Sequence, residues 1–350
     1  MKNTKFKKHE LILFIERLEL YLSSGLTLNQ ALFVARNGTD KKIQKLLENI
    51  CVEVEKGKRL AIVLGEHTKI SKTILGLIEN GESSGGLSHA LQSALTLLEK
   101  QEELKKKCLS AMTYPVVIGI FAVLLTLGLV KGVMPQIIPM LKSLHVQLPL
   151  LTRLVIFLSE NIINFGLYYL IGVIFLISIS VYLYRTNNKL RFYSQKVFIK
   201  FPLVGSLFSL YFLSVFLRSV GSLIENGLSV SVAYQESTNT LSSLPLSKIL
   251  HSNFHNIHRG ISLSKVFSSV SKSLMPTYIP PLIEAGEASG NLGKSLIRSA
   301  HIIDRNIENS LKKLTSLIEP IMMAGIGCVV GSIALSIMMP IYDISKVLQR

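Results

Sequence analysis

Residues 288–295 have the types and spacing of a relaxed phosphate-binding loop. A small residue is followed, at the spacing such a loop requires, by Gly293, Lys294 and Ser295. In a phosphate-binding loop, backbone amides at a helix N-terminus and the lysine converge on phosphate, and the loop follows a β-strand. The preceding residues, 278–284, lack a strand pattern, and no apolar strand ending in Asp follows to hold magnesium. We therefore predict a helix–turn–helix junction and no nucleotide site.

Three histidines have a spacing that suits a metal site on one face of a helix. His251, His255 and His258 lie at positions i, i+4 and i+7, which zinc sites accept. Leu250 and Ile257 define the apolar stripe one residue earlier, so we expect the histidines to flank the core on a more exposed face. We predict no metal or cofactor. No paired acids, Ser-His-Asp arrangement or activated cysteine can be argued either, so we predict a protein that is not an enzyme.

Composition places part of the chain outside water. The chain has 350 residues, of which 49% are hydrophobic and 17% are charged, and its mean hydropathy is +0.43. Soluble proteins carry about 25% charged residues. The 38 Lys and Arg residues exceed the 22 Asp and Glu residues by 16, which indicates anionic neighbours. Because many of the basic residues lie beside apolar runs and lack interleaved aromatic residues, we expect lipid headgroups and no direct binding of nucleic acid.

Three uncharged runs are long enough to cross a bilayer as helices. They are residues 111–130, 162–184 and 320–342, with 20, 23 and 23 residues. A spanning helix needs about 20 predominantly apolar residues. A fourth run, residues 201–217, has 17 uncharged residues, and hydropathy alone does not decide whether it spans.

An internal repeat supplies the missing constraint. The segment Gly81-Glu82-Ser83-Ser84-Gly85-Gly86-Leu87 returns 205 residues later as Gly286-Glu287-Ala288-Ser289-Gly290-Asn291-Leu292. At the same offset, Tyr114-Pro115 matches Glu319-Pro320, and Met134-Pro135 matches Met339-Pro340. Two copies of one water-soluble module should fold in the same compartment, so an even number of crossings must separate them. Residues 201–217 are therefore predicted to form a domain helix, not a third intervening span.

The repeat and the charge distribution together predict a topology. Lys100, Lys105, Lys106 and Lys107 precede the first run, and five basic residues follow the second within residues 185–200. Basic residues favour the cytoplasmic side, so we expect a multi-pass protein of the bacterial inner membrane with a cytoplasmic N-terminus and an extracytoplasmic C-terminus. The predicted segments are a first cytoplasmic copy (1–110), a transmembrane helix (111–135), an extracytoplasmic loop (136–161), a second transmembrane helix (162–184), a second cytoplasmic copy (185–317), a third transmembrane helix (318–342) and a short external tail (343–350).

Helical periods dominate the sequence, and no stretch has a strand pattern, so the predicted fold is an all-α membrane protein. Thr27 and Gln30 have the spacing of a capping box. Gly81 and Gly286 are expected just after a helix end. A long helix is expected over 87–107, with ion pairs Glu102–Lys106 and Glu103–Lys107.

Three acidic residues each have two interpretations. Glu82 and Glu287 either satisfy free amides at the start of the following helix or contact another subunit. Glu319, where the third run begins, either lies at the headgroups or pairs with a partner inside the membrane.

These residues resemble the platform-protein family of type II secretion, type IV pili and competence pseudopili (GspF/PilC/ComGB-like proteins). The resemblance rests on two Gly-Glu-x-Ser-Gly-x-Leu turns and on the boundary pattern from Tyr114-Pro115 to Pro135. Cys108 stands where the family usually has an aliphatic residue, and Glu319 stands where the first copy has tyrosine. The candidate interaction residues are Gly81, Glu82, Ser84, Gly85, Leu87, Gly286, Glu287, Ser289, Gly290, Leu292, Tyr114, Pro115, Pro135, Glu319, Pro320 and Pro340.

The resemblance implies a non-enzymatic scaffold beneath a growing pilus, most similar to the competence (ComGB-like) branch that supports DNA uptake. Its implied partners are a hexameric assembly ATPase, major and minor pilins or pseudopilins, the lipid bilayer and further copies of itself. The platform would couple the ATPase to extraction of pilins from the membrane. One alternative is the platform of a type II secretion or type IV pilus system. More distant alternatives are a small repeat-built transporter and an ATPase.

Overall fold

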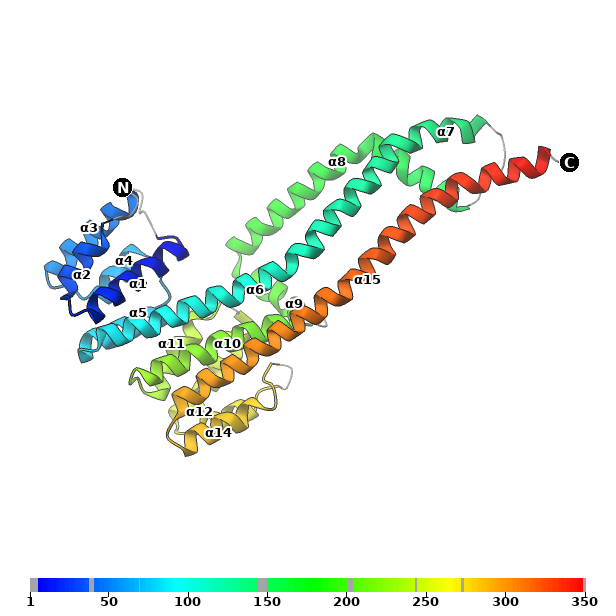
Figure 1. The fold of residues 1–350 in the computed structure, drawn as a ribbon. Coiled ribbons are helices and arrows are strands. Elements are labelled where there is room, and N and C mark those ends of the chain that lie inside the picture. Colours follow the sequence, from blue (N-terminus) through cyan, green and yellow to red (C-terminus); the bar gives the residue numbers. More distant parts are fainter. Residues whose placement is uncertain are drawn as a thin grey trace. The chain divides into compact units, whose positions relative to one another are not determined.

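The computed structural model describes residues 6–37, 41–68, 70–143, 150–200, 204–242, 244–271 and 274–348 (Figure 1). All regular structure in these residues is helical, which confirms the predicted all-α class. The chain forms two compact units. Unit 1 contains Met1–Lys107 and Phe192–Asn309, and unit 2 contains Cys108–Arg191 and Ser310–Arg350.

Unit 1 holds both copies of the repeat, and their helices correspond in order. The first copy is α1 (Lys8–Ser23), α2 (Leu28–Ala35), α3 (Lys41–Glu55), α4 (Leu60–His67) and α5 (Lys72–Ser84), followed by the start of α6 (Leu87–Gly128). The second is α10 (Val204–Glu225), α11 (Val230–Thr240), α12 (Leu244–His258), α13 (Leu263–Ser268) and α14 (Ile279–Ala288), followed by the start of α15 (Leu292–Leu348). Glycines with left-handed backbone also correspond: Gly25 and Gly227, Gly57 and Gly260, Gly85 and Gly290. The structure confirms the repeat.

The capping box predicted at Thr27 begins α2. The backbone N–H of Gln30 donates to Thr27 Oγ1 at 3.4 Å, and Gln30 Oε1 accepts from the Thr27 N–H at 3.0 Å. Two of the free amides at the start of this helix are thereby satisfied. A short-range sequence pattern was sufficient here because both partners lie within one turn.

The apolar helix α10 lies within the core of unit 1. A stretch of α10, Gly205–Glu225, is apolar enough to cross a membrane by composition, but 61% of its apolar window is buried inside the protein. Phe216 is fully buried, and its ring meets those of Tyr234 at 5.2 Å and Phe267 at 6.2 Å between centroids. This burial agrees with the prediction of a domain helix over 201–217; residues 201–203 lie outside the described residues.

Unit 2 is built around apolar helices that leave their side chains exposed. Beyond residue 108, α6 continues past Pro115 and is followed by a π-helical turn (Leu129–Val133) and α7 (Met134–Ser143). The next helix is α8 (Leu150–Thr186), and the part of α15 from Ser310 onward completes the unit. The following helix, α9 (Asn188–Lys200), begins at the end of unit 2 and continues into unit 1. The segment expected to be a loop, 136–161, is therefore largely helical; residues 144–149 of it lie outside the described part of the chain.

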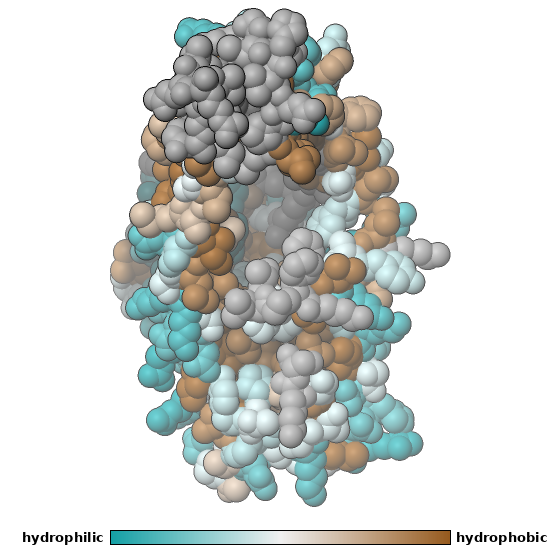
Figure 2. Space-filling view, turned by 90° about the vertical axis from the view of Figure 1, so that its right-hand side faces the viewer, coloured by the Kyte–Doolittle hydropathy of each residue, from teal (hydrophilic) through white to brown (hydrophobic). Residues whose placement is uncertain are grey.

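The exposed surface of unit 2 is that of a membrane protein. Only 6% of the most apolar window of α6, and the same share for α15, is buried within the protein. Phe121 and Phe175 are each 63% exposed, and Figure 2 shows hydrophobic residues reaching the surface on one face. The second run forms a bent pair, Arg153–Tyr169 and Ile171–Tyr184, with a 40° change of direction. Apolar surface on this scale requires lipid or protein to cover it.

Truncation of Phe216 tests whether α10 belongs to the core of unit 1. We expect Phe216→Ala to destabilise the detergent-purified protein by about 3–5 kcal/mol, because it removes buried area and leaves a cavity. Phe33→Ala is the matched control, since Phe33 is 54% exposed, and it should change stability far less. Chemical denaturation followed by helical circular dichroism measures both. Equal effects of the two substitutions would contradict the placement of α10.

Candidate functional site

The repeated Gly-Glu-x-Ser-Gly-x-Leu turn joins α5 to α6 in the first copy and α14 to α15 in the second. Gly85 and Gly290 end the shorter helices, with φ of 78° and 69°, which L-residues with a Cβ rarely adopt. Leu87 and Leu292 are the first residues of the long helices. The glycines predicted just after the helix end, Gly81 and Gly286, instead lie inside α5 and α14, so that assignment was wrong by four residues.

Gly81 and Gly286 serve the close approach of two helices. A Cβ added at Gly81 would lie 2.2 Å from the Cβ of Ala90 on α6, and one added at Gly286 would lie 2.3 Å from the Cβ of Ser295 on α15. Real Cβ contacts are not that short, so only glycine fits. These two positions fix the distance between each long helix and the helix before it.

The carboxylates of Glu82 and Glu287 bind helix N-termini, but not those that we predicted. Glu82 accepts the backbone N–H of Leu60 at 2.7 Å and of Ala61 at 3.4 Å. Glu287 accepts the backbone N–H of Leu263 at 2.5 Å and the hydroxyl of Ser264 at 2.6 Å. The capped helices are therefore α4 and α13, which precede these residues, and not α6 and α15, which follow them.

Glu82 and Glu287 cap helices whose own preceding residues do not cap them. The residues before α4 and α13, Arg59 and Ser262, provide no side-chain cap for the backbone amides of their helix. A carboxylate from the same copy supplies it and also neutralises the positive end of the helix dipole. Ser84 and Ser289 complete each turn through weaker contacts to the carbonyl oxygens of Gly81 and Gly286, at 3.5 Å and 3.4 Å. The motif thus holds each copy together internally.

The boundary residues Tyr114 and Glu319 meet each other within unit 2. They occupy equivalent positions of the two copies, and the Glu319 carboxylate lies close enough to Tyr114 to interact with it electrostatically. Four prolines singled out with them lie in helices: Pro115 in α6, Pro135 at the start of α7, and Pro320 and Pro340 in α15. The side chain of Pro340 lies outside the described part of the structure.

The two apparent ligand sites of the sequence are ordinary helical features. The phosphate-loop pattern falls on the turn between α14 and α15, which is a helix–turn–helix junction as predicted. Gly293 packs against α10, since a Cβ there would lie 2.5 Å from Glu225 Oε1. His251, His255 and His258 are exposed on α12, one residue from the buried stripe, also as predicted.

A cluster on α3 and α4 that sequence reasoning missed brings possible metal ligands together. Oxygen and nitrogen atoms of Glu53, Glu66 and His67 lie within 4.8 Å of one another. Lys58 binds into the same cluster, 2.8 Å from Glu53 and 3.7 Å from Glu66. Hydrogen bonds from Lys58 and then from His67 lower the pKa of Glu53. The lysine ammonium therefore already supplies the positive charge that a metal ion would bring.

Polar contacts join the two copies near the start of α6. Asn226, in the turn after α10, donates to Ser93 Oγ at 3.0 Å and lies 3.3 Å from His89 Nδ1. Its backbone carbonyl accepts from the side chain of Asn80. Further along the interface, the hydroxyls of Thr73 and Thr240 are 2.8 Å apart. One residue of the second copy, through its side chain and its backbone carbonyl, therefore contacts both α6 and α5 of the first.

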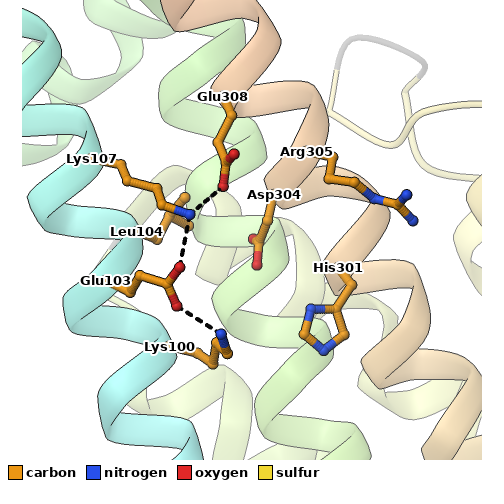
Figure 3. Close-up of a pocket in the computed structure, with 8 residues that line it drawn as sticks. All are labelled: Lys100, Glu103, Leu104, Lys107, His301, Asp304, Arg305 and Glu308. Atoms are coloured by element: carbon orange, nitrogen blue, oxygen red, sulfur yellow. Dashed lines mark hydrogen bonds and ion pairs between the residues drawn. The ribbon is translucent and has the colours of Figure 1, made fainter.

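A charged cleft of about 350 Å³ lies between α6 and α15 within unit 1 (Figure 3). Its lining residues are Lys100, Glu103, Leu104, Lys107, His301, Asp304, Arg305 and Glu308. The predicted pair Glu103–Lys107 is present at 2.7 Å, whereas Glu102 pairs with Lys8 at 2.9 Å instead of with the expected Lys106. Lys100 Nζ also pairs with Glu103 Oε2 at 2.7 Å. Hydrogen bonds from the two lysines lower the pKa of Glu103 to about 2.

The far wall of this cleft is set by a buried ion pair. Arg218 on α10 is buried and pairs with Asp304, which also accepts from Ser214 Oγ. Burial and the nearby positive charge of Arg218 lower the pKa of His301. No local sequence pattern predicts this pair, because Arg218 and Asp304 lie 86 residues apart in the chain. Within the described residues, His301 and Arg305 are the lining groups with no ion-pair partner (Figure 3).

The comparisons with known proteins match both copies. The family model described as type II secretion system (T2SS), protein F, matches residues 14–135 and 216–340. The chain is 29% identical over 336 residues to the type IV pilus assembly protein PilC of Thermus thermophilus, covering 96% of this chain and 82% of that protein. It is 26% identical to PilC of Pseudomonas aeruginosa (98% and 92% covered) and 25% identical to the type II secretion system protein F of Aeromonas hydrophila (96% and 87%).

Two glycines of α5 test the close-approach role of Gly81. We expect Gly81→Ala to destabilise unit 1 by about 1–3 kcal/mol, because the new methyl group overlaps Ala90. Gly76→Ala on the same helix should be neutral or stabilising by up to about 1 kcal/mol, since its Cβ would meet only Leu223 at an ordinary 3.9 Å. Chemical unfolding of the purified variants measures the difference. The interpretation fails if Gly81→Ala is no worse than Gly76→Ala.

Removal of the Glu82 carboxylate tests its capping role. Glu82→Ala should lower stability by about 1–2 kcal/mol, because the first amides of α4 lose their acceptor. Glu79→Ala is the control: its carboxylate lies on the same helix, is 53% exposed and meets only Arg59 at 3.4 Å. Hydrogen exchange should show faster exchange at Leu60 and Ala61 in the first variant only. Unchanged protection of these amides would refute the cap.

Proposed function

Because this chain belongs to the type II secretion system protein F family, we propose that it is the inner-membrane platform on which a type IV pilus-like filament is assembled. The observation that carries the proposal is the duplicated helical module: one family model matches both copies, and each copy continues into an apolar helix. Relatives named as type IV pilus assembly and type II secretion proteins match nearly the whole chain.

The proposed topology places both copies in the cytoplasm. Burial of α10 within unit 1 leaves α6 and α8 as the crossings between the two copies, and two crossings return the chain to the side on which it began. The basic residues around Lys105–Lys107 favour the cytoplasmic face for that side. The N-terminus is then cytoplasmic, and the C-terminus, beyond α15, is extracytoplasmic.

The site residues support a scaffold rather than an enzyme. Gly81, Glu82 and their counterparts are occupied in packing and capping, so they hold the module rigid and leave no catalytic arrangement among themselves. We place the contact with a hexameric assembly ATPase on exposed residues of the same turns, such as Ser83, because turns project from a rigid bundle. The apolar helices of unit 2 are the proposed contact for pilins, and the platform itself is proposed to be a homo-oligomer.

The competence branch is the finer form of the proposal. In it, the filament is a pseudopilus that supports DNA uptake, and the ATPase drives extraction of pseudopilins from the bilayer through this platform. The composition of the chain, rich in Lys, Asn and Ile, motivates this choice.

Deletion and crosslinking together test the platform. Deletion of the gene should abolish filament assembly and leave pilin insertion into the membrane unchanged, because the platform acts after insertion. A photo-crosslinking residue at Ser83 of the complementing protein should capture the assembly ATPase. The measurements are filament shearing with immunoblotting, pilin fractionation and mass spectrometry of the crosslinked band.

The control for crosslinking is the same residue at Phe121, which is exposed on the apolar part of α6 and should not capture the ATPase. Filaments formed by the deletion strain would refute the platform. Transformation assays separate the branches: loss of DNA uptake supports the competence form, and loss of secretion or of surface pili alone supports the others.

A further inference from the structure

Lys107 links the two copies where their long helices leave unit 1. Its Nζ lies 2.6 Å from Glu308 Oε1 on α15 and 2.7 Å from Glu103 Oε1 on its own helix (Figure 3). Hydrogen bonds that its ammonium donates to these two carboxylates raise the pKa of Lys107. The side chain is therefore charged at any physiological pH and bridges α6 to α15.

The two carboxylates that Lys107 bridges are equivalent residues of the repeat. Glu103 and Glu308 are 205 residues apart, the offset that also relates Tyr114 to Glu319. Within unit 2, Glu319 also lies close enough to Tyr114 to interact with it electrostatically. Interactions at these two levels join α6 to α15 in one register. A slip of one turn would separate both pairs, because one turn moves a residue by about 5.4 Å.

The contribution of this ion pair to stability is small. The side chains of Lys107 and Glu308 are 42% and 33% exposed, and exposed pairs contribute little because water and salt screen them. Their geometric effect is larger. α6 is held by Asn226 at Ser93 and by Glu308 at Lys107, about 21 Å further along the helix. Two attachments at that separation fix the position of this part of α6 within unit 1.

We propose that Lys107 and Glu308 are positioning residues for filament assembly: their ion pair keeps α6 and α15 in register, so that movement of unit 1 reaches both helices together. This inference rests on the proposed platform function. Neither residue contacts the ATPase or a pilin in this scheme. Each acts through the helix that carries it.

Charge exchange tests the ion pair in the full-length protein. Lys107→Glu should reduce filament assembly by about tenfold, because three carboxylates would then face one another where an attraction had been. Glu308→Lys should have a smaller effect, since Glu103 still lies between Lys100 and Lys107. The double variant should recover most of the assembly. Lys106→Glu is the matched control: the neighbouring side chain is exposed, and the same charge reversal there should leave assembly unchanged.

A second readout reports the register directly and needs no ATPase. Leu104 lines the cleft and is 3% exposed. In a protein whose Cys51, Cys108 and Cys328 are replaced, L104C should react slowly with a maleimide. Labelling should become several-fold faster with Lys107→Glu and return to the slow rate in the double variant.

The outcomes separate this inference from the platform itself. Assembly that survives Lys107→Glu, or that the double variant fails to recover although Lys106→Glu is active, overturns the positioning role. Unchanged labelling of L104C in Lys107→Glu overturns the register. The Ser83 crosslink to the ATPase should persist in all variants. If the unaltered protein gives no such crosslink, the proposed ATPase contact at Ser83 is wrong. The labelling of L104C still tests whether the Lys107–Glu308 ion pair holds the two helices in register.

Discussion

The structure depends on two helices, α6 and α15, that begin in unit 1 and end in unit 2. Within hydrocarbon, every backbone N–H and C=O must be satisfied inside the segment, and a helix does so in water and in lipid alike. A single helix can therefore pass from water into lipid with its backbone hydrogen bonds satisfied throughout. The start of each long helix then sets its course, and the close packing at Gly81 and Gly286 fixes that start against the preceding helix.

The internal repeat supplies a criterion for the membrane crossings that hydropathy lacks. A protein core and a bilayer both require apolar side chains, so the composition of α10 was compatible with either. Only the repeat, which required an even number of crossings between equivalent copies, separated the two. Hydropathy also does not predict that Arg218 is buried. As a charge after an apolar run it looked like a boundary, whereas its burial depends on Asp304, 86 residues away in the sequence, and no local pattern reveals such a partner.

The sequence pattern predicts the repeated turn correctly, but the structural roles predicted for its glycines and glutamates were wrong. Glycine suits both a left-handed backbone conformation and a close approach of two helices. The residue type alone does not show which of the two roles a glycine has. Gly81 has the second task and Gly85 the first. Glu82 was expected to act on its neighbour along the chain, yet its carboxylate reaches back to Leu60. The capping box at Thr27 was predicted correctly because both partners lie within one helical turn.

The two copies share the residues that pack and cap their interiors, and they differ beside the cleft between α6 and α15. The glycines and caps inside each module recur at equivalent positions, because each copy must solve the same folding problem alone. The ion pair beside the cleft between α6 and α15 does not recur. In the second copy, Arg218 is buried and paired with Asp304, whereas their counterparts in the first, Glu16 and Glu99, are both exposed acids. Two copies that pack against each other present different surfaces to different neighbours, so divergence concentrates there. Function that needs two distinguishable copies must therefore be carried by the unshared residues.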